Sequence, residues 1–380
     1  MVNIMKTINA LHVIPTFSAR DGGPPRALAL MSRALGEQNV AVTIVTTDAR
    51  PFAEDLVKLS RAKFYCFRAH SPRFWRLSPN LWRWLRMNTI NFDVIHIHSI
   101  FDFPTYMASM EARKAGKPYI IRPLGTLDPW GFKRKRWKKL PYYILVEKFN
   151  LRRANAIHVT SVSEAGNVRK LGFQNEVIIP PAIEGYECQR VYRNNFPLRI
   201  CFISRLHQKK GLSVLFRSLH ILRNTGLDVM LDIAGVGDPV YERALHNEVE
   251  CLALKDKVRF LGWCDEKQKR DLLSASDIFV LPSHSENFGN AAAEAMMAGL
   301  PVVVSDGVAL ASEIVCSGAG LVFHVGDAGA LASCIRQLIS LEARQLLGER
   351  SRAFVMEKFS SAMVGMRLRQ LYESVIQSAV

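Results

Sequence analysis

The sequence predicts an α/β protein of two doubly wound domains, each a parallel sheet with helices on its faces. Three observations lead to this prediction. The chain has 380 residues, which is long for one domain and comfortable for two. Short apolar runs of strand length alternate with segments of helical period in both halves. The alternation breaks once in the middle, at Pro180-Pro181, which marks a boundary between domains.

The first domain is predicted to span residues 1–180. A helical stretch follows its first strand and reaches Leu35, and another helix is expected at Pro104–Ala115. Because helix-length segments separate the strands, we expect parallel pairing. Strands are predicted at Asn9–Pro15, Val40–Thr46, Val94–His98, Tyr119–Arg122, Ala156–Thr160 and Glu176–Ile179.

Residues 181–197 lack a clear period and are predicted to form a linker. The second domain is then expected at 198–359, with helices at Leu212–Leu222 and Asp265–Ser274 and a helical C-terminus. Its strands are predicted at Leu198–Ile203, Val229–Ala234, Lys257–Leu261, Ile278–Leu281 and Val302–Ser305.

The composition, 49% hydrophobic and 22% charged, is that of a soluble globular protein. A net charge of +16 favours phosphates, anionic lipid or acidic polymers as partners without distinguishing among them. The seven cysteines form no C-x-x-C pair, which indicates reduced thiols and a cytoplasmic protein. No signal peptide and no apolar run of ~18 residues is evident, so we expect any membrane contact to be peripheral.

The most informative stretch follows the strand that ends at Leu281. A loop carries Glu286, and a helix is predicted to start near Phe288. Unpaired amides at a helix N-terminus, together with the helix dipole, bind a diphosphate well. A carboxylate accepts strong hydrogen bonds from sugar hydroxyls, and we expect Glu294 to accept one from a ribose hydroxyl. The residues predicted to bind this sugar-bearing diphosphate, called the donor below, are Glu286, Asn287, Phe288, Gly289, Asn290 and Glu294.

The alternative is an N-capped helix that bears two solvated glutamates. Glu294 is flanked by alanines on a helix that looks buried, and a buried glutamate needs a partner. The spacing of Glu286 and Glu294 resembles the Glu-x(7)-Glu motif of the retaining GT-B glycosyltransferases of family 4, and Ala298–Val303 continues the likeness. This resemblance is strongest from about Leu198 to Gly320 and implies two Rossmann-like domains facing across a cleft. It also implies that a helix at about 360–380 packs back on the first domain.

Arg205 and Lys210 follow the first strand of the second domain. Two cations there can clamp the diphosphate and stabilise the charge that builds on a leaving group. The matching positions in the family hold an Arg/Lys pair in that role; Lys209 is an ambiguous neighbour, and a basic surface turn is the alternative. Loops containing Gly237 and Trp263 are expected to line the base pocket, and uridine is the base that the family suggests.

In the first domain, Gly22 and Gly23 match the family's glycine-rich loop, although a tight turn explains them too. Strand alternation puts His96 and His98 on one face. The family places a histidine near the reacting centre here. We therefore assign His98 to the site and a structural role to His96.

Residues 133–139 and the aromatic side chains around them are predicted to bind an anionic membrane or the acceptor. The same composition could bind nucleic acid. A third interpretation is a helix whose cations face solvent and whose aromatic rings enter the core. Upstream, residues 73–76 and 82–86 have the same composition. The segment from Arg122 to Trp130 resembles bacterial exopolysaccharide and capsule glycosyltransferases. The acceptor or membrane residues are predicted as Arg122, Lys133, Arg134, Lys135, Arg136, Trp137, Lys138 and Lys139.

Together these features predict a retaining glycosyltransferase on the inner face of the membrane. It would move a hexosyl unit, glucose or a related hexose, from a UDP-sugar to a lipid-linked or polysaccharide acceptor. Its catalytic residues are expected to be His98, Arg205, Lys210 and Glu286. No Asp-x-Asp segment occurs, so we expect neither a metal nor another cofactor. A sugar-nucleotide epimerase or hydrolase of similar architecture, and a non-enzymatic nucleic-acid-binding protein, are the alternatives.

Overall fold

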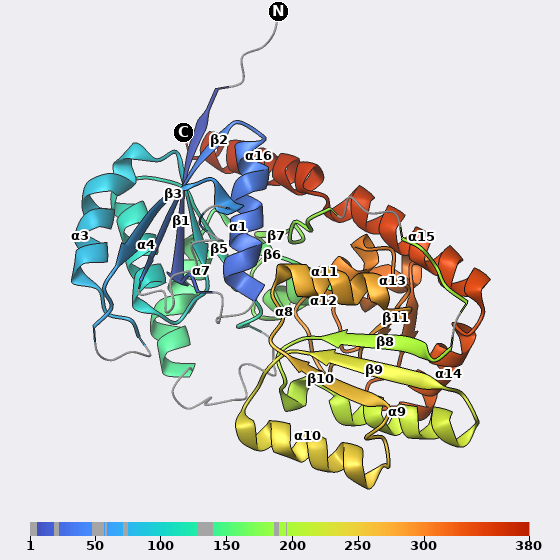
Figure 1. Ribbon diagram of the computed structural model, residues 1–380. Helices are drawn as coiled ribbons and strands as arrows, with labels where there is room; N and C mark the ends of the chain where they lie inside the picture. Colours follow the sequence, from blue (N-terminus) through green and yellow to red (C-terminus); the bar gives the residue numbers. More distant parts are fainter. Residues whose placement is uncertain are drawn as a thin grey trace, which may run out of the picture. The chain divides into compact units, whose positions relative to one another are not determined.

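The computed structural model describes residues 6–18, 23–47, 57, 59–70, 75–127, 140–185, 190–194 and 196–379 (Figure 1). The chain divides into two compact units. The first unit comprises Met1–Ala182 and Phe359–Val380, and the second comprises Ile183–Lys358. Each unit contains one sheet, as predicted.

The first unit holds a seven-stranded sheet in the order β3-β2-β1-β4-β5-β6-β7. Every pairing in it is parallel. The strands are β1 (Ile8–Thr16), β2 (Val40–Thr47), β3 (Lys63–Phe67), β4 (Val94–His98), β5 (Tyr119–Arg122), β6 (Ala156–Val159) and β7 (Glu176–Ile178). The helices are α1 (Gly23–Gly36), α3 (Pro79–Asn88), η2 (Thr89–Asn91), α4 (Phe103–Lys114), η3 (Tyr143–Glu147), α7 (Lys148–Arg153), α8 (Val162–Lys170) and α16 (Ser361–Gln377).

Side-chain alternation along β1 divides the core of this unit between the two faces of its sheet. Leu11 and Val13 point to the face that α3 and α4 cover, whereas Ala10 and Ile14 point to the face that α1 and α16 cover. The chain's last helix, α16, packs directly on α1 (Figure 1). Gly365 permits this approach, because a Cβ there would lie 2.5 Å from the carbonyl oxygen of Ala34.

The second unit holds a six-stranded sheet in the order β10-β9-β8-β11-β12-β13, again wholly parallel. Its strands are β8 (Leu198–Ile203), β9 (Val229–Ala234), β10 (Val258–Gly262), β11 (Ile278–Leu281), β12 (Val302–Ser305) and β13 (Leu321–Phe323). Its helices are η4 (Gln208–Lys210), α9 (Leu212–Asn224), α10 (Pro239–Cys251), α11 (Glu266–Ala275), α12 (Asn290–Met297), α13 (Ala311–Ser317), α14 (Ala328–Gln337) and α15 (Leu341–Phe359).

Two doubly wound parallel sheets confirm the predicted fold class. Two strands escaped the sequence analysis. β3 is an edge strand whose side chains are mostly exposed, so it lacks an apolar run, and β13 has only three residues. The predicted helix start near Phe288 was wrong by two residues: Gly289, at φ 105°, caps α12, which begins at Asn290.

Two glycines at positive φ in the second unit offer a test of the fold. Gly211 has φ +69°, and a Cβ there would lie 2.0 Å from the carbonyl oxygen of Pro282; Gly226 has φ +79° and open space. Gly226→Ala should cost about 1 kcal/mol from backbone strain alone. Gly211→Ala should cost ~1–3 kcal/mol more, because β11 must move away. Urea unfolding followed by circular dichroism measures both, and equal losses would contradict the packing described.

Candidate active site

The chain reverses its winding direction in the second unit between β8 and β11, which lie side by side although far apart in sequence. In doubly wound sheets, ligands bind beyond the carboxyl ends of the strands at such a switch point. The loops that follow these two strands carry the predicted residues. They also contact each other: the amide of His284 donates to the carbonyl oxygen of Lys209 at 2.8 Å. The topology therefore joins two separate sequence motifs into one surface.

Lys210 and Glu286 form an ion pair across the two loops. Their side chains are 12% and 21% exposed, so both charges are largely withdrawn from water while still reachable by a ligand. Sequence reasoning predicted each residue as a ligand contact but not their mutual pairing. Arg205, the other predicted cation, is exposed in the same loop as Lys210.

Backbone hydrogen bonds fix the loop that carries Glu286. The amide of Glu286 donates to the carbonyl oxygen of Gly307 at 2.9 Å, and the Glu286 carbonyl accepts from the amide of Ala309 at 3.1 Å. Phe288 anchors the loop further, since its ring is buried and its carbonyl accepts from the amide of Leu310 at 3.2 Å. The carboxylate is thereby held on a rigid backbone.

The loop ends where α12 begins, at a turn that only glycine tolerates well. A Cβ on Gly289 would lie 2.8 Å from Val308 Cγ1, and its φ is positive. The first-turn amides of α12, from Asn290 to Ala292, have no acceptor one turn earlier in the helix. Asn290 Oδ1 and Ser283 Oγ are buried without a hydrogen-bond partner among the described residues. Asn287 precedes this turn and is partly buried.

Glu294 has a protein partner that the sequence analysis missed. Lys269 of α11 is buried, and its Nζ lies 2.8 Å from Glu294 Oε2 and 3.1 Å from Glu266 Oε2. A glutamate on an apolar helix predicted such a partner, because buried charges require pairing. The spacing of residues along the sequence did not identify Lys269, which lies on a different helix.

The loops after β9 and β10 lie beside the loop after β8. Gly235 donates its amide to the carbonyl oxygen of Gly262 at 2.7 Å, and Leu206 pairs with Gly237 as an isolated bridge. A Cβ on Gly237 would lie 2.1 Å from the Leu206 carbonyl oxygen. Trp263 is 63% exposed. The predicted base-binding residues thus share the carboxyl edge of this sheet with Arg205.

In the first unit, Gly23 is the first residue of α1, and Gly22 lies outside the described residues. His98, the last residue of β4, is fully buried and stacks on His96 and His12 at ring-centroid distances of 4.5 and 5.1 Å. Both nitrogens of His96 are hydrogen-bonded, to Tyr372 and to His158. His98 Nδ1 has no partner among the described residues.

Burial keeps these histidines neutral. It lowers the pKa of His12 and of His158 to about 3 and the pKa of His96 and His98 well below the usual 6.5, and the nearby Arg122 guanidinium lowers them further. Arg122 pairs in register with His98 and is only 2% exposed. Its side chain therefore lies in the interior of the first unit, and its role in binding the acceptor or a membrane stays a prediction.

Two acids that the sequence did not single out lie at the loop that follows β4: Asp102 belongs to the loop, and Glu147 of η3 contacts it. Ser99 and Phe101 have positive φ, and the amide of Phe101 donates to Glu147 Oε1 at 2.7 Å. Burial raises the pKa of Glu147 to about 7 and that of Asp102 to about 6. Backbone strain beside buried carboxyl groups is typical of a functional loop.

The predicted basic and aromatic segments have different outcomes. Residues 133–139 lie outside the described part of the chain. In the upstream segment the Trp82 indole donates to Glu111 Oε1 at 2.9 Å, and Trp84 packs against Tyr65 and Phe92. Arg83 and Arg86 of this segment are exposed and Arg76 is half-buried, while Arg73 lies outside the described residues. At residues 82–86 the aromatic rings therefore pack toward the core while Arg83 and Arg86 face solvent, and binding of this segment to a membrane or acceptor stays a prediction.

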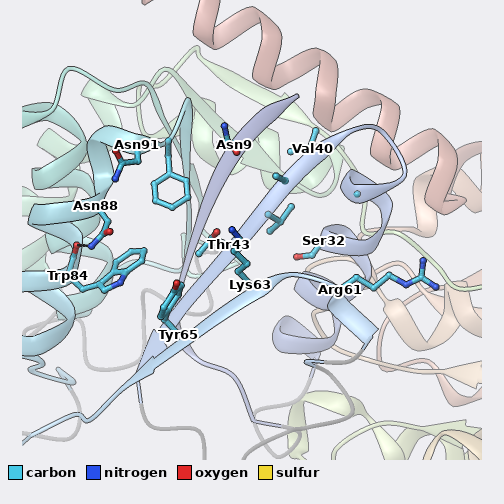
Figure 2. Close-up of a pocket in the computed structure, with 14 residues that line it drawn as sticks. Asn9, Ser32, Val40, Thr43, Arg61, Lys63, Tyr65, Trp84, Asn88 and Asn91 are labelled. Atoms are coloured by element: carbon cyan, nitrogen blue, oxygen red, sulfur yellow. Dashed lines mark hydrogen bonds between the residues drawn. The ribbon is translucent and has the colours of Figure 1, made fainter. Parts of the chain in front are cut away.

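A pocket of about 410 Å³ lies at the amino ends of β1, β2 and β3 (Figure 2). Trp84 and Tyr65 border it on one side, with Asn88 and Asn91 beside them. None of the predicted site residues lines it. It occupies the edge of the sheet opposite to the one where doubly wound folds bind their ligands.

Two sequence models of known families match consecutive parts of the chain. "Glycosyl transferase 4-like domain" matches residues 22–182, and "Glycosyl transferases group 1" matches residues 191–354, which includes both loops of the ion pair. The chain belongs to the group 1 glycosyltransferases. The predicted family is therefore confirmed.

Relatives of this glycosyltransferase come from several bacteria. It is 31% identical over 219 residues to the uncharacterized glycosyltransferase YqgM of Bacillus subtilis, which is 56% of this chain and 58% of that one. It is 35% identical over 153 residues to the amylovoran biosynthesis glycosyltransferase AmsK of Erwinia amylovora, which is 39% of this chain and 37% of that one. The chain thus spans about half the length of the relatives it matches, or less.

Solved structures show that this glycosyltransferase has the GT-B type of fold. The Anabaena protein HepE in complex with UDP and glucose matches 97% of this chain and 100% of that chain, with a TM-score of 0.77 and 18% identity. Sucrose-phosphate synthase from Thermosynechococcus elongatus matches 98% and 100%, with a TM-score of 0.74 and 19% identity. Among the described residues, no helix is both long and apolar enough to cross a bilayer.

The buried histidines predict acid lability. Their folded-state pKa values lie below the unfolded 6.5, so the stability they contribute is present above pH 6.5 and is lost as pH falls toward 3. Each adds ~1.4 kcal/mol per pH unit to the loss. Urea unfolding at stepped pH should show a shallower slope for His158→Gln than for the exposed control His70→Gln. The same slope for both would contradict the neutral cluster.

Proposed function

We propose that the protein transfers a hexosyl unit from a UDP-sugar to a lipid-linked or polysaccharide acceptor in the synthesis of a cell-envelope glycan. The observation that carries the proposal is the junction of two loops at β8 and β11, which sets Lys210 against Glu286 beside the first turn of α12. Solved structures of the same fold contain UDP or UDP-glucose, and relatives are named for exopolysaccharide and capsule synthesis. Glucose or a related hexose is the sugar that we propose.

The diphosphate binds against cations and free amides. Lys210 and Arg205 supply positive charge, and the first-turn amides of α12 supply donors and the positive end of the helix dipole. Phosphate oxygens compete with Glu286 for Lys210, and this leaves the carboxylate free to accept from a sugar hydroxyl. These groups stabilise the leaving diphosphate, so the proposed reaction uses no metal and no other cofactor.

The proposed chemistry retains the anomeric configuration. The bond between the anomeric carbon and the phosphate oxygen breaks while the acceptor hydroxyl attacks from the same face, and the departing phosphate takes the acceptor's proton. The protein's residues then hold and stabilise rather than attack the sugar. The family resemblance supports this step.

Apolar side chains support a peripheral position on the cytoplasmic face of an anionic membrane. Ile144, Leu145 and Phe149 are 55%, 78% and 48% exposed on η3 and α7, just after the basic segment 133–139 in sequence. Arg152 and Arg153 are exposed on the same helix. Exposed apolar groups beside cations favour a bilayer interface, where the cations meet headgroups and the apolar groups enter the acyl boundary.

The central test compares neighbouring lysines. Lys210→Ala and Glu286→Ala should each lower turnover by ~10²–10³-fold with the fold intact, because each removes a group that contacts the donor. Lys209→Ala, a matched change one residue away, should stay within about threefold of wild type. UDP release is measured with and without a lipid-linked glycan, and NMR of the product gives its anomeric configuration.

Wild-type turnover in Lys210→Ala or Glu286→Ala would refute the assignment of the site. UDP release that is equally fast without acceptor would favour the hydrolase or epimerase alternative. An inverted product would remove the same-face mechanism. Steeply salt-dependent RNA binding without UDP affinity would favour the nucleic-acid alternative.

The membrane proposal predicts separable effects of charge and apolar surface. Replacing the cations of 133–139 with Gln should weaken binding to phosphatidylserine vesicles strongly, since each cation contributes about 1 kcal/mol. Leu145→Ser should also weaken binding, whereas Val315→Ser, an exposed valine in the second unit, should not. The Gln variant of 133–139 and Leu145→Ser should both keep wild-type UDP affinity. Vesicle sedimentation measures the binding, and unchanged partitioning of the first two variants would remove the membrane proposal.

A further inference from the structure

Four histidines and one tyrosine form a continuous hydrogen-bonded chain across the sheet of the first unit. All five side chains are fully buried, and they come from β1, β4, β6 and α16. The chain begins at the carbonyl oxygen of Ile179 and ends at His98. Its contacts are His158 Nε2 to Ile179 O (2.8 Å), His96 Nε2 to His158 Nδ1 (3.2 Å), Tyr372 Oη to His96 Nδ1 (2.8 Å), His12 Nε2 to Tyr372 Oη (3.0 Å) and His98 Nε2 to His12 Nδ1 (3.0 Å).

The carbonyl end fixes the first proton. A carbonyl oxygen only accepts, so His158 must carry its proton on Nε2. A neutral imidazole has one N–H, which makes His158 Nδ1 an acceptor and requires His96 to donate from Nε2. His96 Nδ1 is then also an acceptor, and the hydroxyl of Tyr372 must donate to it.

The same logic continues to the other end. The Tyr372 hydroxyl has used its one proton, so its oxygen accepts from His12 Nε2. His12 Nδ1 is therefore an acceptor, and His98 donates to it from Nε2. The last atom of the hydrogen-bonded series is His98 Nδ1. It bears a lone pair, is buried, and has no donor among the described residues.

Neutrality of every ring is required for this assignment, and burial provides it, as the lowered pKa values indicate. The arrangement also leaves little for a metal ion. His12, His96 and His98 bring nitrogens within 4.8 Å of one another, but both nitrogens of His12 and of His96 are already in hydrogen bonds of the chain. A metal there would have to break them.

Buried donors lie on the neighbouring strand, at the same register as His98. Arg122 pairs in register with His98, and its Nε and Nη1 have no hydrogen-bond partner among the described residues. A buried acceptor and buried donors at the carboxyl end of neighbouring strands suit a hydroxyl, which both donates and accepts. Unpaired buried polar atoms are rare in proteins and usually receive a ligand or water.

We propose that Tyr372 and His12 are positioning residues that hold His98 in its Nε2–H tautomer, with the Nδ1 lone pair presented to a hydroxyl of a bound sugar. The ligand part of this inference rests on the proposed function; the tautomer part does not. The C-terminal helix α16 thereby acts on the site through one hydroxyl group, although Tyr372 lies 274 positions along the chain from His98.

Removal of the Tyr372 hydroxyl should reverse the direction of the hydrogen bond between His12 and His98. In Tyr372→Phe, the Nε2–H of His12 would face a phenyl ring without an acceptor. A buried unpaired N–H costs more than a buried unpaired lone pair, so His12 should move its proton to Nδ1 and donate to His98 Nε2. The proton of His98 then moves to Nδ1, and the site presents a donor where it presented an acceptor.

The experiment reads the tautomers directly in the ligand-free protein. Long-range ¹H–¹⁵N NMR of ¹⁵N-histidine-labelled wild type should show His98 with a bare Nδ1 and a protonated Nε2, the resonances being assigned with His98→Gln. In Tyr372→Phe the Nδ1 resonance should shift toward the protonated position. Tyr119→Phe is the matched control, since Tyr119 is equally buried and its hydroxyl donates to Asn150 O at 2.7 Å outside the chain; it should leave His98 unchanged.

Kinetics supply the second arm. Tyr372→Phe should lower kcat/KM by roughly three- to tenfold, the value of one neutral hydrogen bond, while UDP affinity stays within twofold of wild type. A rise in KM for the UDP-sugar assigns the hydroxyl to the donor sugar, and a rise in KM for the acceptor glycan assigns it to the acceptor. Tyr119→Phe should change neither.

Three results would overturn the inference. These are a wild-type spectrum with His98 protonated on Nδ1, a His98 tautomer that does not respond to Tyr372→Phe, and one equivalent of zinc retained through purification. Because the wild-type spectrum does not depend on Tyr372→Phe, poor folding of that variant would not prevent the test. If the tautomers are as stated but no sugar transfer occurs, the proposed function fails and the histidine chain stands.

Discussion

The ion pair between Lys210 and Glu286 depends on one topological constraint, the adjacency of β8 and β11. Parallel strands present their carboxyl ends at one edge, and reversal of the winding direction opens a gap between the helices at that edge. The loops meet there closely enough that Gly211 has no room for a side chain. The ion pair and the loop that leads into α12 follow from this junction, whereas Gly237 and Trp263 reach the same edge from β9 and β10.

The first unit depends on a different constraint, because it buries several polar side chains under one helix, α16. His12, His96, His98 and His158 lie on the sheet face that α16 covers, where an unpaired polar atom is costly. The hydroxyl of Tyr372 pairs with His96 and His12 from that helix. The chain returns to its first unit after completing the second, and this return supplies the group that the histidines lack.

Much of the architecture could be predicted because its causes are local. Buried parallel strands are near-continuous apolar runs, so Ile278–Leu281 was placed to the residue. β3 was missed because an edge strand need not be apolar, and the start of α12 was misplaced because a positive φ at Gly289 is a response to packing against Val308. Trp82 and Trp84 show a similar limit, because the composition of their segment suggested a binding surface whereas both rings are partly buried against the core.

The sequence by itself determined the fold class, the family and the two loops that carry Lys210 and Glu286, since these depend on residue type, period and short spacing. Only the tertiary structure decided which groups pair: Lys210 with Glu286, Lys269 with Glu294, and Tyr372 with two histidines. The physical reason is that hydrogen bonds and ion pairs act over a few ångströms in space. The partners in these pairs are separated by 25 to 360 positions in the chain, and no local pattern encodes such a meeting.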